Sequence, residues 1–364
     1  MRPAILSFTI LLLTFGLSGC LRPGEERAQR DLQIGQQTMG ASSVRVENGL
    51  AAVQDFSDER LIVWASAPSL TIDLEVQDPA SEFALEIHNC MPAGELRAPP
   101  GVVVTRIPQP EPTRCSYTLT GLPESGTLNF ATSTASDVNP FRFAVLSDVQ
   151  EAIGEVQDVF ETINAQEDIE FLLGAGDLTE QGTLSQLERY QQELRMLDIP
   201  YYTTLGNHEL GTNPPPFQDL FGRASFSFEH RGIRFTLLDS GSAGIDPLVF
   251  DELDRWLKAG ETAPHVVAMH VPPIDPVGVR NGSFASRNEG AKLLSKLASH
   301  GVDLTLYGHV HTYFNFENAG IPAHISGGGG AVPERFDNIE RHILVIDVTP
   351  STSDFDVSVV RVDL

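Results

Sequence analysis

Positive charge is scarce in this sequence, which holds 24 Lys and Arg against 49 Asp and Glu and has a formal net charge of −25. This shortage excludes nucleic acid or an anionic membrane surface as the main partner, because those interfaces need clustered Lys and Arg. Surface charges are screened beyond about 8 Å at physiological salt, so a locally positive site could still hold a small anion. Solubility is the simplest explanation of the acidic surface.

Long apolar runs are missing except near the N-terminus, where Arg2 precedes the run Ala4 to Leu17 and the tetrapeptide Leu-Ser-Gly-Cys ends at Cys20. The run is about 14 residues, shorter than the roughly 20 that a membrane-spanning helix needs, and indicates a secretory signal. Its end resembles the lipobox of bacterial lipoproteins, which implies that Cys20 is lipidated. We expect an exported protein held to a bacterial membrane, at its periplasmic face or the cell surface, by the lipid anchor only.

Cysteine is scarce as well, since only three are present among 364 residues. If Cys20 is lipidated, Cys90 and Cys115 remain as a pair in an oxidising compartment. We predict a disulfide between them, because both lie near strand ends of one expected β region. Two buried thiols are the alternative.

The remaining length suits about two domains of about 150 residues each. We expect a signal peptide at 1–19, then lipidated Cys20 and a flexible tether to residue 43, within which a short helix at 25–33 is an option. A β-sandwich domain is expected at 44–135 and a second domain at 140–364, with a linker over 131–140.

The region 44–135 shows period-two alternation, for example Leu70, Ile72, Leu74 and Val76 against polar neighbours. Short alternating segments broken by Pro and Gly predict a small antiparallel sandwich. After Pro140 apolar strands precede helical segments, the strands being expected at 143–146, 171–173, 201–205, 235–238, 266–269 and 304–307, and the helices at 151–165, 184–196, 247–258 and 287–299. This alternation predicts an α/β domain with mostly parallel strands.

Residues that bind metals follow most of these strands directly. Asp148, Asp177, Asn207-His208, His270 and His309-Val310-His311 each stand at a strand's carboxyl end. Ligand sites of α/β sheets lie at that edge, so these side chains are expected to meet there.

The set resembles the calcineurin-like metallophosphoesterase family, whose pattern is D-x-H, GD, GNH, H and GHxH in this order. The resemblance covers roughly 140–330 and implies a four-layer α-β-β-α fold after the sandwich. It also implies two divalent metal ions, with Asp177 bridging them, Asp148, Gln150 and His311 on the first, and Asn207, His270 and His309 on the second. A metal-bridging hydroxide would attack a small phosphorylated substrate, with Asn207 and His208 binding it and His208 acting as general acid.

Position 150 departs from the pattern, because Gln stands where the family usually has His. A carboxamide oxygen is a harder ligand than imidazole, so we expect Mn or Fe to be favoured, with Zn possible. The alternative is that Gln150 points away and the first metal is held loosely or not at all.

Other candidates have weaker support. Arg280 and Arg287 could clamp a phosphate, although solvated loop arginines are the simpler explanation. The run Gly327 to Gly330 lacks the ending of a P-loop and is expected to be a turn packed beneath the metal site.

Three functions compete at this point. The first is a hydrolase of phosphate monoesters, diesters or pyrophosphates. The second is a catalytically impaired surface lipoprotein that keeps the fold and binds a metal or ligand through a weakened first site. The third is an adhesin acting through the β domain. The sequence does not name the ester or the oligomeric state.

Overall fold

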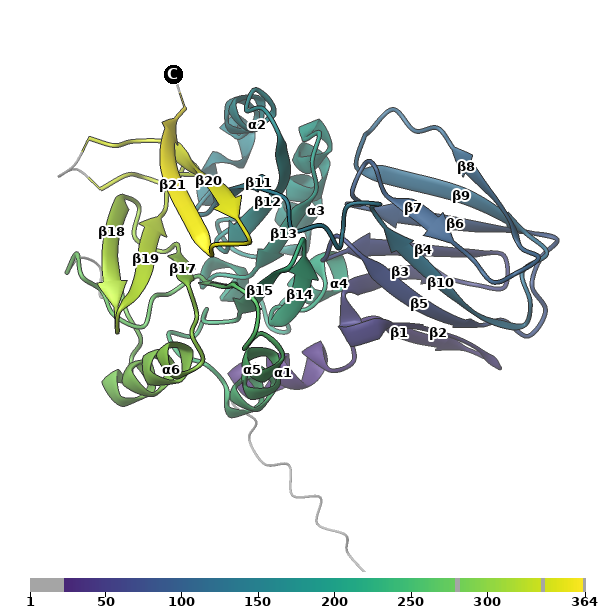
Figure 1. Ribbon diagram of the computed structural model, residues 1–364, viewed down its shortest axis with the longest axis horizontal. Helices are drawn as coiled ribbons and strands as arrows, with labels where there is room; N and C mark the ends of the chain where they lie inside the picture. Colours follow the sequence, from purple (N-terminus) through teal and green to yellow (C-terminus); the bar gives the residue numbers. More distant parts are fainter. Residues whose placement is uncertain (1–22, 279–281, 335–337, 363–364) are drawn as a thin grey trace, which may run out of the picture.

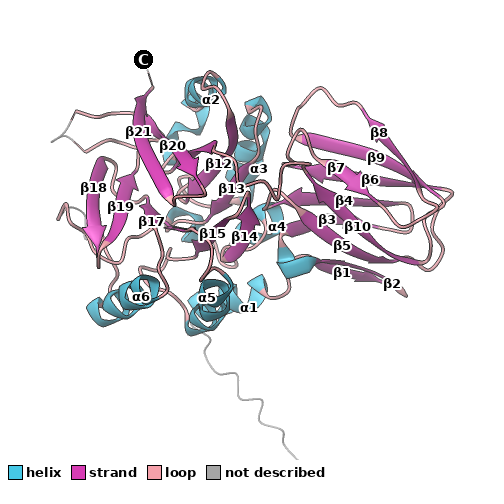
Figure 2. Ribbon diagram, viewed as in Figure 1, coloured by secondary structure: helices cyan, strands magenta, loops and turns pink. Residues whose placement is uncertain are grey.

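The computed structural model describes residues 23–278, 282–334 and 338–362, which form two bodies side by side (Figure 1). Within the described residues, one body is built from strands, loops and a short 3₁₀ segment, while the six α-helices belong to the other body or its boundary (Figure 2). Cys20 and the expected signal peptide lie outside the described residues. Among the described helices none is long and apolar enough to cross a membrane.

The first body is a pair of five-stranded sheets. One sheet has the order β1-β2-β5-β10-β7, with β1 (Gln36–Met39), β2 (Ser42–Val46), β5 (Leu70–Glu75), β10 (Ser125–Ala131) and β7 (Glu95–Arg97). The other has the order β3-β4-β6-β9-β8, with β3 (Ala51–Phe56), β4 (Arg60–Ala65), β6 (Glu82–His88), β9 (Arg114–Thr120) and β8 (Val103–Ile107).

The alternation read from the sequence places one apolar core in this sandwich. Leu61, Ile72, Leu85 and Leu128 are each fully buried in it. The predicted disulfide joins Cys90 and Cys115, with an S–S distance of 1.99 Å. The prediction of a purely antiparallel sandwich is wrong in one pair, because β4 and β6 run parallel. Residues 66–81, including β5 in the opposite sheet, provide the crossover that a parallel pair requires.

The second body contains two further sheets. The first has the order β13-β12-β11-β20-β21, with β13 (Tyr201–Thr204), β12 (Ile169–Ala175), β11 (Phe141–Leu146), β20 (His342–Thr349) and β21 (Asp354–Arg361). The second has the order β14-β15-β16-β17-β19-β18, with β14 (Phe226–His230), β15 (Ile233–Leu238), β16 (His265–Met269), β17 (Leu304–Tyr307), β19 (Ile321–Ser326) and β18 (Tyr313–Asn318). Strands β11 to β13 are mutually parallel, and so are β15 to β17.

Aromatic side chains join these two sheets face to face. Phe143 and Phe171 of one sheet stack with ring centroids 5.4 Å apart, and each meets Phe235 of the other sheet edge-on at 5.3 Å. All three rings are fully buried, and each contributes about 1.5–3 kcal/mol by burial.

Helices cover the two outer faces, which gives the α-β-β-α layering that was expected. The first sheet is covered by α2 (Gln157–Asn164) and α3 (Leu184–Glu193), and the second by α5 (Pro247–Ala259) and α6 (Arg287–Ser299). The expected helix at 151–165 divides into a 3₁₀ segment, η2 (Gln150–Glu155), and α2, while that at 184–196 ends in η3 (Leu194–Met196). Further short elements are the helix α4 (Phe217–Phe221) and the 3₁₀ segments η1 (Glu47–Gly49) and η4 (His208–Gly211).

Side-chain caps fix where the long helices begin. Asp246 accepts a hydrogen bond from the amide of Leu248 before α5, and Ser286 accepts one from the amide of Glu289 before α6. Pro247 follows as the first residue of α5, where its missing N–H has no cost.

The segment expected to be a flexible tether is ordered from Pro23 onward. Helix α1 (Pro23–Asp31) packs on α5, and its Ala28 joins the core on that face (Figure 1). Arg27 is 4% exposed and forms a bidentate pair with Asp239, with Nε–Oδ2 at 2.8 Å and Nη2–Oδ1 at 3.2 Å. The tether prediction is therefore wrong for residues 23–43, because charged groups that look solvated in sequence meet partners about 200 residues away.

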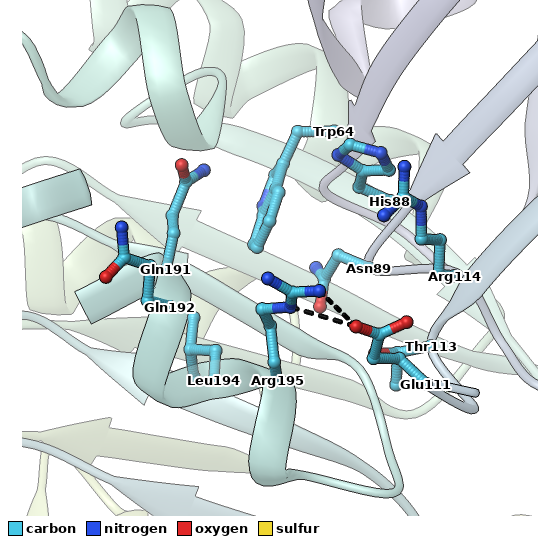
Figure 3. Close-up of a pocket in the computed structure, with 10 residues that line it drawn as sticks. All are labelled: Trp64, His88, Asn89, Glu111, Thr113, Arg114, Gln191, Gln192, Leu194 and Arg195. Atoms are coloured by element: carbon cyan, nitrogen blue, oxygen red, sulfur yellow. Dashed lines mark hydrogen bonds and ion pairs between the residues drawn. The ribbon is translucent and has the colours of Figure 1, made fainter. Parts of the chain in front are cut away.

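Asn89 and an ion pair connect the two bodies. The side-chain NH₂ of Asn89 donates to the carbonyls of Ala65 and Tyr201, and its side-chain oxygen accepts from the backbone amide of Tyr201, all at 2.7 Å. Asn89 of the sandwich thus bonds the backbone of the edge strand β13. Arg195 of η3 pairs with Glu111 of the sandwich beside a small cleft that Trp64 also lines (Figure 3).

Candidate metal centre

The predicted site residues come together where parallel strands of both sheets end. Asp148 follows β11, Asp177 follows β12, and Asn207 follows β13 after a two-residue turn. From the second sheet, His270 directly follows β16, and the segment from Gly308 to His311 follows β17. The face-to-face packing of the sheets places both sets of strand ends at one site.

Several of these residues hold an unusual backbone conformation. Asp148, Gln150, Asp177 and His309 have φ of 63°, 48°, 53° and 70°, in the left-handed region that costs non-glycine residues energy. The turn after β13 also lies very close to the turn after β12, since a Cβ on Gly206 would lie 2.0 Å from Asp177 Oδ1. Strain of this kind persists where the surrounding fold determines it, and it gathers at functional sites.

The first group of side chains is Asp148, Gln150 and His311, all buried. His311 Nε2 lies 3.4 Å from Asp148 Oδ1 and 3.2 Å from Gln150 Nε2. Gln150 Nε2 also donates to Asp177 Oδ2 at 2.9 Å, so its side chain points into the site. Turning the amide by 180° would present its oxygen to the same point.

The second group is Asn207, His270 and His309. His270 Nε2 lies 3.1 Å from Asn207 Oδ1 and 3.1 Å from Asp177 Oδ2. The ring of His309 stands edge-on to that of His270 with centroids 5.1 Å apart, and ligand atoms of Asp177, His270 and His309 lie within 4.8 Å of one another. Asp177 Oδ2 thus contacts members of both groups.

Backbone carbonyls orient three histidines. Nδ1 of His270 lies 2.8 Å from the carbonyl oxygen of Ala175. Nδ1 of His311 lies 2.7 Å from that of Val332, and Nδ1 of His208 lies 2.7 Å from that of Glu180. A carbonyl can only accept, so each Nδ1 carries the proton and each Nε2 is turned toward the site. Metal-binding histidines are commonly held in this way.

The donor set fits cations. Ligands 2.0–2.2 Å from one ion lie about 2.9–3.4 Å apart, the spacing seen between His311 and Asp148 and between His270 and its two oxygen neighbours. Asp148 Oδ1 is buried, has no hydrogen-bond donor among the described residues and faces His311 Nε2. A buried acceptor of this kind is expensive unless a cation balances it.

The electrostatics of the protein groups favour positive charge at this point. Burial opposes a charged His270, but Asp177 and Asp148 raise its pKa to about 9. Burial likewise opposes a charged Asp148, yet His270 and His311 hold its pKa well below the usual range. Burial and the neighbouring His270 lower the pKa of His309 to about 4, which keeps it neutral.

Glu209 is a site residue to which sequence reasoning assigned no role. It is fully buried and accepts hydrogen bonds from the amides of Gly206 at 2.8 Å and Thr179 at 3.0 Å. Burial and the nearby Asp177 raise its pKa to about 7. It ties the turn after β12 to the turn after β13, and the acidic residue directly after Asn207-His208 was the signal that could have identified it.

The remaining candidates are placed as follows. Arg280 lies outside the described residues, and Arg287 is exposed at the start of α6 with no hydrogen-bond or ion-pair partner in the described parts of the chain. The glycine run packs beneath the site as expected, since Gly329 N donates to the Ser147 carbonyl and Ala331 N to that of Asp148.

Residues 141–313 match the model of the family described as calcineurin-like phosphoesterase. The chain is therefore similar, over this segment, to calcineurin-like phosphoesterases. It is 33% identical over 155 residues to a Synechococcus protein named "Probable cyclic nucleotide phosphodiesterase" and 28% identical over 156 residues to a 3′,5′-cyclic-nucleotide phosphodiesterase of Nostoc, each match covering 40% of this chain. A serine/threonine-protein phosphatase of Bos taurus is 31% identical over 156 residues, or 36% of this chain.

The matched segments span 59%, 58% and 50% of these three relatives. Among solved structures, a dimetal phosphatase from Danio rerio is similar with a TM-score of 0.48 and 13% identity, covering 61% of this chain and 99% of that one.

Proposed function

We propose that this protein hydrolyses phosphate esters with two divalent metal ions. The observation that carries the proposal is the position of Asp177 Oδ2, which lies 2.9 Å from Gln150 Nε2 in the first group and 3.1 Å from His270 Nε2 in the second. One carboxylate between two sets of ligand atoms is what a pair of cations about 3.5–4 Å apart requires. The first cation would be held by Asp148, Gln150 and His311, and the second by Asn207, His270 and His309.

Bound cations would supply Lewis acidity and lower the pKa of coordinated water, which provides the nucleophile. The protein's own residues orient the carboxylates that would hold these cations. Ser147 donates to Asp148 Oδ2 at 2.5 Å and His309 N donates to the same oxygen at 2.9 Å, which leaves Oδ1 toward the first group. His208 N donates to Asp177 Oδ1 at 2.9 Å and fixes the shared carboxylate in the same way.

His208 is the residue suited to proton transfer. Its side chain is 28% exposed, and its Nε2 lies 3.9 Å from Asp177 Oδ2, at the edge of the ligand cluster. The bond from Nδ1 to the Glu180 carbonyl turns Nε2 toward the ligand cluster. A protonated His208 would donate to the departing oxygen as general acid, and Asn207 beside it would bind the phosphate.

We infer that the substrate is a small phosphodiester, because two of the curated relatives are named as cyclic nucleotide phosphodiesterases. Monoesters are the second choice, since the third relative is named as a protein phosphatase. Gln150 favours Mn or Fe over Zn, because a carboxamide is a hard oxygen ligand. We further propose that the protein acts outside the cytoplasm on a lipid anchor at Cys20.

The second candidate function is a metal- or ligand-binding lipoprotein without catalysis. Its support is Gln150, whose amide contacts both Asp177 and His311 and could occupy the first position in place of a cation. The two functions differ in the number of metal ions that each chain holds.

A metal-loading assay on the chain from residue 21 onward separates them. We expect about two metal ions per chain with Mn²⁺ and release of nitrophenol from bis(p-nitrophenyl) phosphate. Asp177→Asn should lose at least one ion and lower kcat about a thousandfold, as expected for several kcal/mol of transition-state stabilisation. The control is Asp356→Asn, on the exposed side of β21, which should change neither. One ion per chain without turnover on esters or nucleotides would favour the binding protein.

His208→Asn tests the proton donor. We expect kcat to fall about 10²- to 10⁴-fold while the metal content is retained. The loss should be larger for a phenyl ester than for a p-nitrophenyl ester, since the poorer leaving group depends more on the proton. Equal losses on both esters would contradict this role.

A further inference from the structure

A cavity of about 350 Å³ lies between α1 and the turn that follows His208. Its lining includes Leu210 and Thr212 from that turn, Pro214 and Pro215 from the next segment, and Arg27, Arg30 and Ser242. The volume is at the lower end of the range of about 300–1,000 Å³ found for small-ligand sites, enough for one ring system.

Two walls of this cavity belong to turns that touch the metal centre. Leu210 N donates to the carbonyl of Asn207 at 3.2 Å, within the same 3₁₀ turn as His208. Ser242 follows Gly241, which approaches the Gly206 carbonyl so closely that a Cβ there would lie 2.8 Å from it. The cavity is therefore built partly on the turn that carries Asn207 and His208 and on the turn packed against Gly206.

Both arginines that line the cavity already have partners, while the carboxylate of Glu26 does not among the described residues. Arg27 Nη2 donates to Ser242 Oγ at 2.9 Å besides pairing with Asp239, while Arg30 pairs with Asp219 and donates to the Pro215 carbonyl at 2.9 Å. No arginine there is left for a second phosphate. Exposed Glu26 has no hydrogen-bond or ion-pair partner among the described residues and would repel an anion.

The apolar faces that remain are flat. Proline rings, the Leu210 side chain and planar guanidinium groups pack well against a ring, and Glu26 can accept a hydrogen bond from a ring N–H. Such a lining recognises an uncharged heteroaromatic ring with N–H donors.

We propose that this cavity is the subsite for the organic group of the ester, and that it takes the base of a nucleoside. The proposal rests on the proposed function and deepens it by naming the substrate class. Helix α1 forms one wall, and the buried pair between Arg27 and Asp239 holds that wall in place.

The test compares two diesters with the same leaving group, thymidine 5′-(p-nitrophenyl) phosphate and methyl p-nitrophenyl phosphate. Ser242→Phe fills the cavity from an exposed position, and Ser242→Ala is its control, because it removes the bond to Arg27 and leaves the space open. We expect Ser242→Phe to raise KM for the thymidine ester at least about tenfold, with kcat and the methyl ester within about twofold. Ser242→Ala should leave both esters within about twofold.

Equal effects of Ser242→Phe on both esters, or no effect on either, would overturn the subsite. If the Mn²⁺-loaded wild type cleaves neither ester, the proposed function fails instead. Calorimetric titration with thymidine 5′-phosphate and methyl phosphate then decides the subsite alone. Weaker binding of the nucleotide by at least about tenfold in Ser242→Phe supports it, and unchanged binding rejects it.

Discussion

The sandwich and the α/β body use buried polar groups differently. In the sandwich the core is apolar, and its left-handed non-glycine residues are turn asparagines, Asn48 and Asn89. In the α/β body buried carboxylates and histidines gather at strand ends, and four of the residues there adopt left-handed backbone. One body thus gains stability from apolar burial and a disulfide, while the other also buries charged groups and holds strained backbone where its parallel strands end. The difference indicates where chemistry lies.

Removing Arg27 should have the largest effect on stability. Arg27→Ala leaves Asp239 buried without its bidentate partner, so we expect the unfolding free energy of the α/β body to fall by about 3–5 kcal/mol. Urea unfolding followed by the fluorescence of Trp256, on α5, in a Trp64→Phe background measures this. Arg45→Ala, which removes an exposed pair with Asp73 in the sandwich, is the control. Followed by the fluorescence of Trp64 in a Trp256→Phe background, it should cost less than about 1 kcal/mol. Equal losses of unfolding free energy in the two variants would contradict the view that buried charge stabilises the α/β body more than surface charge stabilises the sandwich.

Removing the disulfide should affect the other body. Cys90→Ala with Cys115→Ala frees a loop of 25 residues, and we expect the unfolding free energy of the sandwich to fall by about 3 kcal/mol. Metal content and kcat should stay unchanged, because both cysteines belong to the apolar core of the sandwich. Calorimetry with a metal assay on the same sample provides the check. A loss of metal would show that the two bodies depend on each other.

The smallest expected effect is a pH dependence at Glu170. Burial opposes its charge, but His230 and Arg231 lower the pKa of this carboxylate in the folded state. A lowered folded pKa gives stability that is present above the unfolded value of 4.5 and is lost as pH falls through the folded value. Glu170→Gln should therefore cost about 1 kcal/mol at pH 7 and clearly less near pH 3, which lies below the unfolded value. A cost that is constant between these pH values would contradict the assignment.

Much of the α/β body could be predicted from its sequence. The helices expected at 247–258 and 287–299 are confirmed as α5 and α6, and the strand expected at 304–307 is β17. Local periodicity carries this information, and the strand-end rule then brings Asp148, Asp177 and His270 together.

Other features depend on contacts that local pattern does not encode. The parallel pairing of β4 and β6 and the role of Glu209 follow from tertiary packing. The docking of α1 is the clearest example, because the segment reads as polar and unstructured until Asp239 and Asp219 are in place.

The position of α1 also bears on the order of synthesis. Its partner Asp239 lies 212 residues further along the chain, so at about 5–20 residues per second the helix waits about 10–40 s before it can dock. During that time it must stay soluble, and among the residues from Gly24 to Asp31, whose burial is described, Ala28 has the only buried apolar side chain in the finished fold. A helix that docks last through ion pairs rather than apolar surface presents little to aggregate while the chain is incomplete.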